Sequence, residues 1–158
     1  MRRSEFGFRQ AKIGVDESVA TRYIINVASA SYQHDEHRVH LVMYHLIFCP
    51  KRRKKVLVGD VGRDLDALIR EKCAEQKWIV HELAIMPDHV HLFVQVNPDD
   101  SASETTRHIK GYTSRVLRQR YPELLKLPSL WTRSFFAASA GNVSKETIQR
   151  YIAAQRGM

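Results

Sequence analysis

Two histidines separated by a single residue are the side chains of this sequence with the clearest chemical use. His89 and His91 lie in the run HVHLFV, whose apolar and β-branched residues predict a strand. Alternate side chains of a strand point to the same face, so the two imidazoles project together, with Cβ atoms roughly 7 Å apart, while Val90 points to the core. Asp88 precedes them in a turn, so we expect the pair near the start of the strand, where side chains reach solvent or substrate. Two imidazoles placed in this way can share one metal ion, although such a pair can also be exposed or hydrogen-bonded within the protein.

A tyrosine and a glutamine near the end of the sequence form a second candidate pair. Tyr151 and Gln155 are four residues apart, so a helix over 144–156 places both side chains on one face. A phenol and an amide therefore project together. Isoleucines lie beside the pair at helical spacing, and an aromatic side chain in that setting is otherwise typical of a hydrophobic core.

Basic residues outnumber acidic ones, with 25 Lys and Arg against 17 Asp and Glu and a formal net charge of +8. A charge of this sign favours a polyanionic partner, and nucleic acid is the leading candidate. One basic cluster follows the first predicted strand, and the other lies along one face of a predicted helix at 102–120. The residues expected to contact phosphates are Lys51, Arg52, Arg53, Lys54, Arg107, Lys110, Arg115 and Arg118. A solvated helix face would also explain the second group.

The predicted helix at 102–120 has two distinct faces. Its packed face is expected to carry Ile109, Tyr112, Thr113 and Val116, and its opposite face Arg107, Lys110, Ser114 and Arg118. The sequence thus predicts a helix that packs on one side and presents a basic stripe on the other.

A length of 158 residues suits one compact domain with a single active site. Cys49 and Cys73 form no CxxC pair and lie near no histidine at zinc-finger spacing, so neither a disulfide framework nor a structural zinc site is indicated. No apolar run approaches the roughly 18 residues of a membrane span, and the first residues lack the apolar block of a secretory signal. We therefore expect a soluble, cytoplasmic protein with an appendage of unknown role at 1–36 and one domain at 37–158.

Strands and helices alternate along the rest of the sequence. We expect strands at 39–48, 78–86, 89–96 and 131–139, and helices at 61–76, 102–120 and 144–156. The first strand ends at Pro50, and the dipeptide Pro87-Asp88 makes the middle two strands a hairpin. The order βαββαβα suits an α+β fold with a four-stranded antiparallel sheet and two helices on one face. This is the ferredoxin-like arrangement, here followed by a C-terminal helix that carries Tyr151.

Four stretches of the sequence, taken in order, resemble a known enzyme family. They are YHLIFCPKRRKKVL at 44–57, MPDHVHLFV at 86–94, LWTRSFFAASAGNV at 130–143 and YIAAQ at 151–155. Together they look like the HUH one-tyrosine transposases of single-strand insertion sequences, and the match covers 39–156. The combination of His-hydrophobe-His with a later Tyr-x-x-x-Gln is far more specific than either motif alone.

The resemblance implies a homodimer that binds hairpins at the ends of a mobile element and cleaves and rejoins single-stranded DNA through a 5′-phosphotyrosine intermediate. It implies Tyr151 as the nucleophile and His89, His91 and Gln155 as ligands of a divalent metal, Mg²⁺ or Mn²⁺. We further predict that Tyr151 of one subunit works beside the histidines of the other, because the short segment Ala140-Gly141-Asn142-Val143 before the last helix can swing that helix toward either subunit. The sequence by itself leaves assembly within one subunit open. Physical chemistry agrees, because a divalent ion stabilises an anionic phosphodiester under attack and a phenol with a pKa near 10 ionises readily beside a metal.

Three other functions stay open from the residues alone. A histidine-triad nucleotide hydrolase carries His-x-His-x-His, but the third position here is Phe93 and the helix with Tyr151 would have no role. A non-catalytic RNA or DNA binder on the same fold would stack bases on aromatic residues of the sheet, but its signature Lys/Arg-Gly-aromatic-Gly/Ala-Phe-Val is absent. A domesticated relative that processes repeated palindromes would use the same chemistry.

Overall fold

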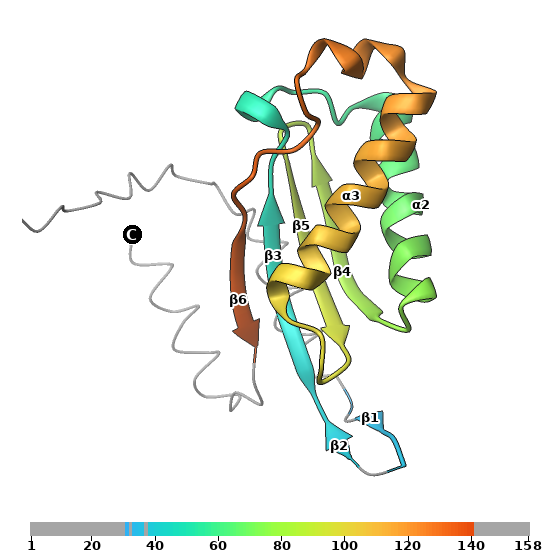
Figure 1. Cartoon of the computed structure of the whole chain (residues 1–158), viewed down its shortest axis with the longest axis vertical. Helices are drawn as coiled ribbons and strands as arrows, with labels where there is room; N and C mark the ends of the chain where they lie inside the picture. Colours follow the sequence, from blue (N-terminus) through green and yellow to red (C-terminus); the bar gives the residue numbers. More distant parts are fainter. Residues whose placement is uncertain (1–30, 32, 37, 141–158) are drawn as a thin grey trace, which may run out of the picture.

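A four-stranded antiparallel sheet forms the centre of the structure (Figure 1). The computed structural model describes residues 31, 33–36 and 38–140. The strands are β3 (Val42–Phe48), β4 (Ile79–Met86), β5 (His89–Val96) and β6 (Phe136–Ala140), in the spatial order β4-β5-β3-β6. Strands β5 and β3 are the two inner strands, and β5 is buried along its whole length. An inner strand of this kind can hold side chains rigidly on both faces.

Two long helices cover one face of this sheet (Figure 1). They are α2 (Gly59–Glu75) and α3 (Ala102–Arg120). The buried residues of α2 recur at three- and four-residue spacing and are Val61, Leu65, Leu68, Ile69 and Cys73. Helix α3 begins after Ser101, whose side-chain oxygen accepts a hydrogen bond from the backbone N–H of Glu104 at 3.1 Å. The element order β-α-β-β-α-β with both helices on one face confirms the predicted α+β architecture of this part of the chain.

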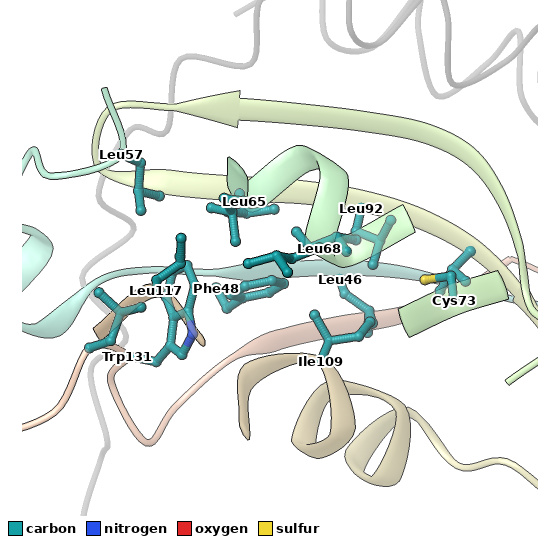
Figure 2. Packing of buried hydrophobic residues seen from close by; sticks show 14 of the residues in the cluster. Leu46, Phe48, Leu57, Leu65, Leu68, Cys73, Leu92, Ile109, Leu117 and Trp131 are labelled. Atoms are coloured by element: carbon teal, nitrogen blue, oxygen red, sulfur yellow. The ribbon is translucent and has the colours of Figure 1, made fainter. Parts of the chain in front are cut away.

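The hydrophobic core lies between the helices and the sheet (Figure 2). Its labelled side chains are Leu46, Phe48, Leu57, Leu65, Leu68, Cys73, Leu92, Ile109, Leu117 and Trp131. The Trp131 ring packs edge-on against Phe48 with centroids 4.9 Å apart, and its Nε1 donates to Thr113 Oγ1 at 3.1 Å. Trp131 also forms an isolated antiparallel bridge with Pro50. The segment that leads into β6 is therefore fastened to the core before the strand begins.

Smaller elements complete the described part of the chain. They are β1 (Gln33–His34), β2 (Val39–His40), the 3₁₀ turn η1 (Lys51–Arg53) and the 3₁₀ turn η2 (Pro122–Lys126). Strands β1 and β2 pair with each other in a separate two-stranded sheet. No helix among the described residues has the length and apolar character needed to span a bilayer.

Several predicted boundaries need correction. The strand predicted at 39–48 is two strands in two sheets, β2 and β3, with Leu41 between them. The strand predicted at 131–139 begins only at Phe136. The side chain of Trp131 is buried in the core, and pairing with β3 starts at Phe136. The strand at 78–86 begins at Ile79, and the helix at 61–76 begins at Gly59 and ends at Glu75.

Two of the predictions fall outside the described residues. These are the C-terminal helix at 144–156 and most of the appendage at 1–36. Tyr151 and Gln155 belong to the first of these segments, so their positions stay predictions.

Candidate active site

The two histidines of the HxH motif lie on the sheet face opposite the helices. Val90, Leu92 and Val94 of β5 belong to the core beneath the helices, so strand alternation directs His89 and His91 to the other side. The two imidazole rings meet edge to face, with centroids 4.9 Å apart and planes at 73°. The prediction that the pair shares a face while Val90 enters the core is confirmed.

Both histidines are more buried than the sequence suggested. The exposed fraction is 9% for His89 and 4% for His91, so of the two surroundings expected at the strand start, solvent or substrate, open solvent does not apply. Strand β5 is an inner strand, so neighbouring strands flank the pair on both sides. Its neighbours place Met86 opposite His89, and Ala84 and Ile47 on either side of His91. A buried pair of imidazoles has less freedom to rotate and is shielded from bulk water.

A carboxylate and an arginine stand behind His89. Asp88 Oδ1 lies 2.7 Å from His89 Nδ1, and Asp88 Oδ2 accepts a hydrogen bond from the Arg53 guanidinium at 2.9 Å. The hydrogen bond with His89 is the main cause that lowers the pKa of the Asp88 carboxyl, and the positive charge of Arg53 lowers it further. An ionised carboxylate at Nδ1 holds the proton of a neutral imidazole there and leaves the lone pair on Nε2.

A third histidine stands behind His91. His45 of β3 places Nε2 at 3.3 Å from His91 Nδ1, and its ring stacks on Phe93 with centroids 4.5 Å apart. Burial, together with the smaller effect of a neighbouring histidine, lowers the pKa of both His45 and His91 to about 4. Both rings are therefore neutral at physiological pH, which is the form in which imidazole binds a metal.

The donor atoms present fit part of a metal site. Each motif histidine has Nδ1 engaged, and within the described part of the chain no hydrogen bond reaches Nε2 of either. Imidazoles held at Nδ1 in this way can offer Nε2 to a divalent cation. No group of three His, Cys, Asp or Glu side chains within residues 31, 33–36 and 38–140 is arranged to hold a metal ion. A complete site therefore needs a further ligand, and Gln155, the predicted third ligand, lies outside those residues, as does Tyr151.

The basic cluster after the first long strand lies next to this site. Lys51 N–H donates to the Leu130 carbonyl at 2.7 Å, which fastens η1 to the segment that leads to β6. Arg52 and Arg53 have φ values of 58° and 51°, in the left-handed region that residues with side chains rarely adopt. The turn directs Arg53 to Asp88, so this residue faces the histidine site, while Arg52 and Lys54 are exposed.

The basic stripe predicted along α3 is only partly solvated. Arg107 and Arg115 are exposed, as expected. Lys110, however, is half-buried and donates to the carbonyls of Thr132 and Ser134. Arg118 is half-buried and donates to the Leu127 carbonyl at 3.1 Å. The four basic residues predicted to line this helix therefore do not form one uniform exposed stripe, because the chain between η2 and β6 crosses this side of the helix and binds two of them.

The packed face of α3 contains the predicted residues and further ones. Ile109 and Thr113 are buried, and Tyr112 and Val116 are half-buried and pack against the core. Thr105, Thr106 and Leu117 are also buried. The buried threonines satisfy their hydroxyls within the helix; Thr105, for example, donates to the Ser101 carbonyl at 2.9 Å. The buried face of α3 therefore includes threonines that the spacing of apolar residues did not predict.

Comparison with known proteins places the chain in a family. Residues 38–155 match the family described as Transposase IS200 like. The chain is 32% identical over 120 residues to the ISDra2 transposase TnpA of Deinococcus radiodurans, an alignment that covers 74% of this chain and 86% of that protein. It is 28% identical over 113 residues to the transposase for insertion sequence element IS200 of Salmonella typhimurium, covering 69% of this chain and 73% of that protein.

Solved structures share the fold. A crystal structure of a Deinococcus radiodurans protein superposes with a TM-score of 0.64 at 28% identity, covering 78% of this chain and 97% of that one. The structure of a REP-associated tyrosine transposase bound to a REP hairpin superposes with a TM-score of 0.50 at 16% identity, covering 75% and 68%, and supports the fold alone. Because the family match runs through both histidines and nearly the whole of the region beyond the N-terminal segment, the chain belongs to the IS200-like transposase family.

Proposed function

We propose that this chain cleaves and rejoins single-stranded DNA with Tyr151 as nucleophile and with a divalent ion, Mg²⁺ or Mn²⁺, bound by His89, His91 and Gln155. Membership of a transposase family supports DNA cleavage and joining as the activity. The observation that carries the metal assignment is the arrangement behind the motif: Nδ1 of each histidine is engaged, so two Nε2 atoms on one sheet face are left for an ion.

The proposed reaction needs two transfers at one phosphorus. The phenolic oxygen of Tyr151 attacks the scissile phosphate and loses its proton to solvent, while the bond from phosphorus to the 3′-oxygen breaks and that oxygen takes up a proton. The DNA end stays attached as a 5′-phosphotyrosine. A 3′-hydroxyl of another DNA end then attacks the same phosphorus and releases the tyrosine, so no external energy source is required. When bound, the divalent ion supplies positive charge that stabilises the charge developing on the nonbridging oxygens.

The side chains hydrogen-bonded to the two proposed ligand histidines add little negative charge that would offset the charge of the ion. Asp88 carries a negative charge, but its second oxygen is paired with Arg53. His45 behind His91 is neutral. The two ligand histidines therefore bring little net negative charge to the site, which favours a strongly polarising cation.

The proposed substrate is a hairpin at the end of a mobile element, with the adjoining single strand as the segment that is cut. The net charge of +8 supports a polyanionic substrate, and exposed Arg52, Lys54, Arg107 and Arg115 supply phosphate contacts. Lys51 and Arg53 beside them, and the half-buried Lys110 and Arg118, complete the set of basic residues proposed to act on the DNA. We further propose a homodimer in which Tyr151 of one subunit serves the histidines of its partner.

The decisive experiment is a search for the covalent intermediate. A labelled single-stranded oligonucleotide that carries an element-end hairpin is incubated with the protein and Mg²⁺ and resolved on a denaturing gel. The wild type is expected to form a protein-linked band, and Tyr151→Phe is expected to bind the hairpin without forming it, because only the phenolic oxygen is lost.

A matched control tests whether loss of the covalent band is specific to Tyr151 or follows from the loss of any tyrosine hydroxyl. Tyr44→Phe removes another phenol, whose hydroxyl donates to the Asp100 carbonyl at a distance of 3.1 Å and does not contact the motif histidines. This variant is expected to keep the covalent band. A covalent band in Tyr151→Phe would rule out the proposed nucleophile.

A further inference from the structure

His45 is held against His91 by the register of two central strands. Strands β3 and β5 are antiparallel, with His45 opposite Phe93 and Ile47 opposite His91. The rings of His45 and His91 have centroids 5.5 Å apart and lie within 24° of parallel, and their facing nitrogens are 3.3 Å apart. Because His45 also stacks on Phe93, its ring has little room to turn away.

The hydrogen bond between the two rings constrains their protons. One of the two facing nitrogens must carry a hydrogen and the other must offer a lone pair. A neutral His91 that presents a lone pair on Nε2 carries its hydrogen on Nδ1, so Nδ1 donates and His45 Nε2 accepts. The neutral His45 ring must then carry its own hydrogen on Nδ1. Only this combination keeps both the observed contact and a metal-binding Nε2.

We propose that His45 is a positioning residue that holds His91 in the Nδ1–H tautomer and fixes the plane of its ring, so that Nε2 faces the cation. The inference rests on the proposed function, since it concerns the same metal site. His45 has for His91 the role that Asp88 has for His89. The difference is that His45 accepts the hydrogen bond without adding a negative charge.

Two substitutions separate the acceptor from the shape of the ring. His45→Phe keeps a flat ring that can stack on Phe93 but removes the accepting nitrogen. His45→Gln removes the ring but has an amide oxygen with a reach similar to that of Nε2. We expect ¹⁵N NMR of the metal-free full-length chain to show His91 as the Nδ1–H tautomer in the wild type and in His45→Gln, with Nε2–H gaining population in His45→Phe.

Binding of Mn²⁺ gives the second measurement. Loss of the partner behind a ligating histidine typically weakens metal binding roughly 10- to 100-fold, so this is the change expected for His45→Phe, with restoration in His45→Gln. His81→Phe is the matched control, since it removes another histidine hydrogen bond on the same sheet, from His81 Nε2 to Gln95 Oε1 at 2.8 Å. It is expected to leave both Mn²⁺ affinity and the His91 tautomer unchanged.

The outcomes distinguish this inference from the proposed function. If His91→Ala binds Mn²⁺ as tightly as the wild type does, the proposed metal site is wrong. If His91→Ala loses Mn²⁺ while His45→Phe keeps both wild-type affinity and the Nδ1–H tautomer, the positioning role alone is wrong. Should His45→Phe not fold, the wild type still decides, because an Nε2–H tautomer of His91 in the metal-free protein would overturn the proposal.

Discussion

His89 and His91 each receive a partner at Nδ1 from a different element, Asp88 from the turn before β5 and His45 from β3. The identical residue types of the motif therefore have unequal surroundings. His89 is backed by a carboxylate paired with Arg53, and His91 by a neutral ring. Both arrangements leave Nε2 as the atom that can bind a cation.

Removal of either motif histidine should remove the metal. We expect His89→Ala and His91→Ala each to weaken Mn²⁺ binding by at least about 10-fold and to abolish the covalent DNA band, since one remaining imidazole holds the ion poorly. Isothermal titration with Mn²⁺ and the gel assay measure the two effects. Hairpin binding by each variant and its urea unfolding curve are the controls for folding. Unchanged metal-dependent cleavage in either variant would mean that the histidine pair does not bind the catalytic metal.

Trp131 supports the path of the chain into β6. Its exposed fraction is 5%, its ring packs against Phe48, and Nε1 donates to Thr113 Oγ1. Trp131→Phe is expected to lower the free energy of unfolding by about 1–3 kcal/mol, because a buried hydrogen bond and part of the packed volume are lost. Urea unfolding measures the change. Phe136→Leu, at a ring that is 53% exposed, should change stability by less than about 0.5 kcal/mol, and an equal effect of both substitutions would refute the anchoring role.

Asp64 joins α2 to the end of α3. Its carboxylate accepts from the Tyr121 hydroxyl at 2.8 Å and from the Arg120 guanidinium at 3.2 Å. The hydrogen bond from Tyr121 is the main cause that lowers the pKa of Asp64 below its ordinary value of 3.8. A carboxyl whose folded pKa is lowered stabilises the fold above its unfolded pKa, and that stabilisation disappears as the pH falls through the folded pKa.

The pH dependence of this contact can be tested directly. Asp64→Asn should unfold at a lower urea concentration than the wild type at pH 7, and the difference should shrink as the pH falls below about 4. Tyr121→Phe removes the same hydrogen bond from the other side, so the double variant should show little additional loss. A difference that stays constant down to strongly acidic pH would mean that the ionised carboxylate is not the stabilising group.

Some basic side chains of α3 are exposed to solvent, and others bind backbone carbonyls within the fold. Arg107 pairs with exposed Glu104 at 3.4 Å, and Arg115 lies over the Tyr112 ring at 5.7 Å, so both exposed side chains can reach a DNA backbone. Lys110 and Arg118 instead bind backbone carbonyls of the segment that crosses the helix. Neutralising Lys110 is therefore expected to act on stability as well as on binding.

The exposed pair is the cleaner test of DNA contact. We expect Arg107→Gln with Arg115→Gln to weaken binding of single-stranded hairpin DNA and to reduce the slope of log affinity against log salt by about 1.4, at about 0.7 for each lost phosphate contact. Fluorescence anisotropy over a range of salt concentrations measures both quantities. Arg63→Gln with Arg70→Gln removes the same charge from ion-paired positions on α2 and should have a smaller effect. Equal slopes for the two double variants would mean that net charge alone, and not the α3 surface, governs binding.

The assembly of the whole active site can be tested by mixing defective chains. One chain carries Tyr151→Phe and the other carries His89→Ala with His91→Ala, so that each homodimer is inactive. If tyrosine and histidines come from different subunits, a heterodimer contains one complete site and should recover cleavage. Two different affinity tags allow the heterodimer to be isolated before the covalent band is measured. Inactivity of verified heterodimers would reject the trans arrangement for the cleavage step.

Local patterns in the sequence determined most of the fold. The strand-like runs, the helical spacing of Val61, Leu65 and Leu68, and the alternation of His89, Val90 and His91 all depend on neighbours within a few residues. For that reason the element order, the helices on one face and the placement of the histidine pair could be predicted. The same local rules placed the first residues of β3 and β6 too early in the sequence, because the residue at which a strand begins depends on pairing partners elsewhere in the chain.

Only the tertiary structure decided what stands behind and around the site. His45 meets His91 across 46 positions of sequence, and no periodic pattern reports the register that brings them together. Burial of the histidine pair is likewise a property of the folded chain, in which β5 lies between β3 and β4. Lys110 reaches the carbonyl of Thr132 because the chain folds back over α3. Sequence determines which faces side chains take along an element, whereas contacts between distant elements are set by how those elements pack.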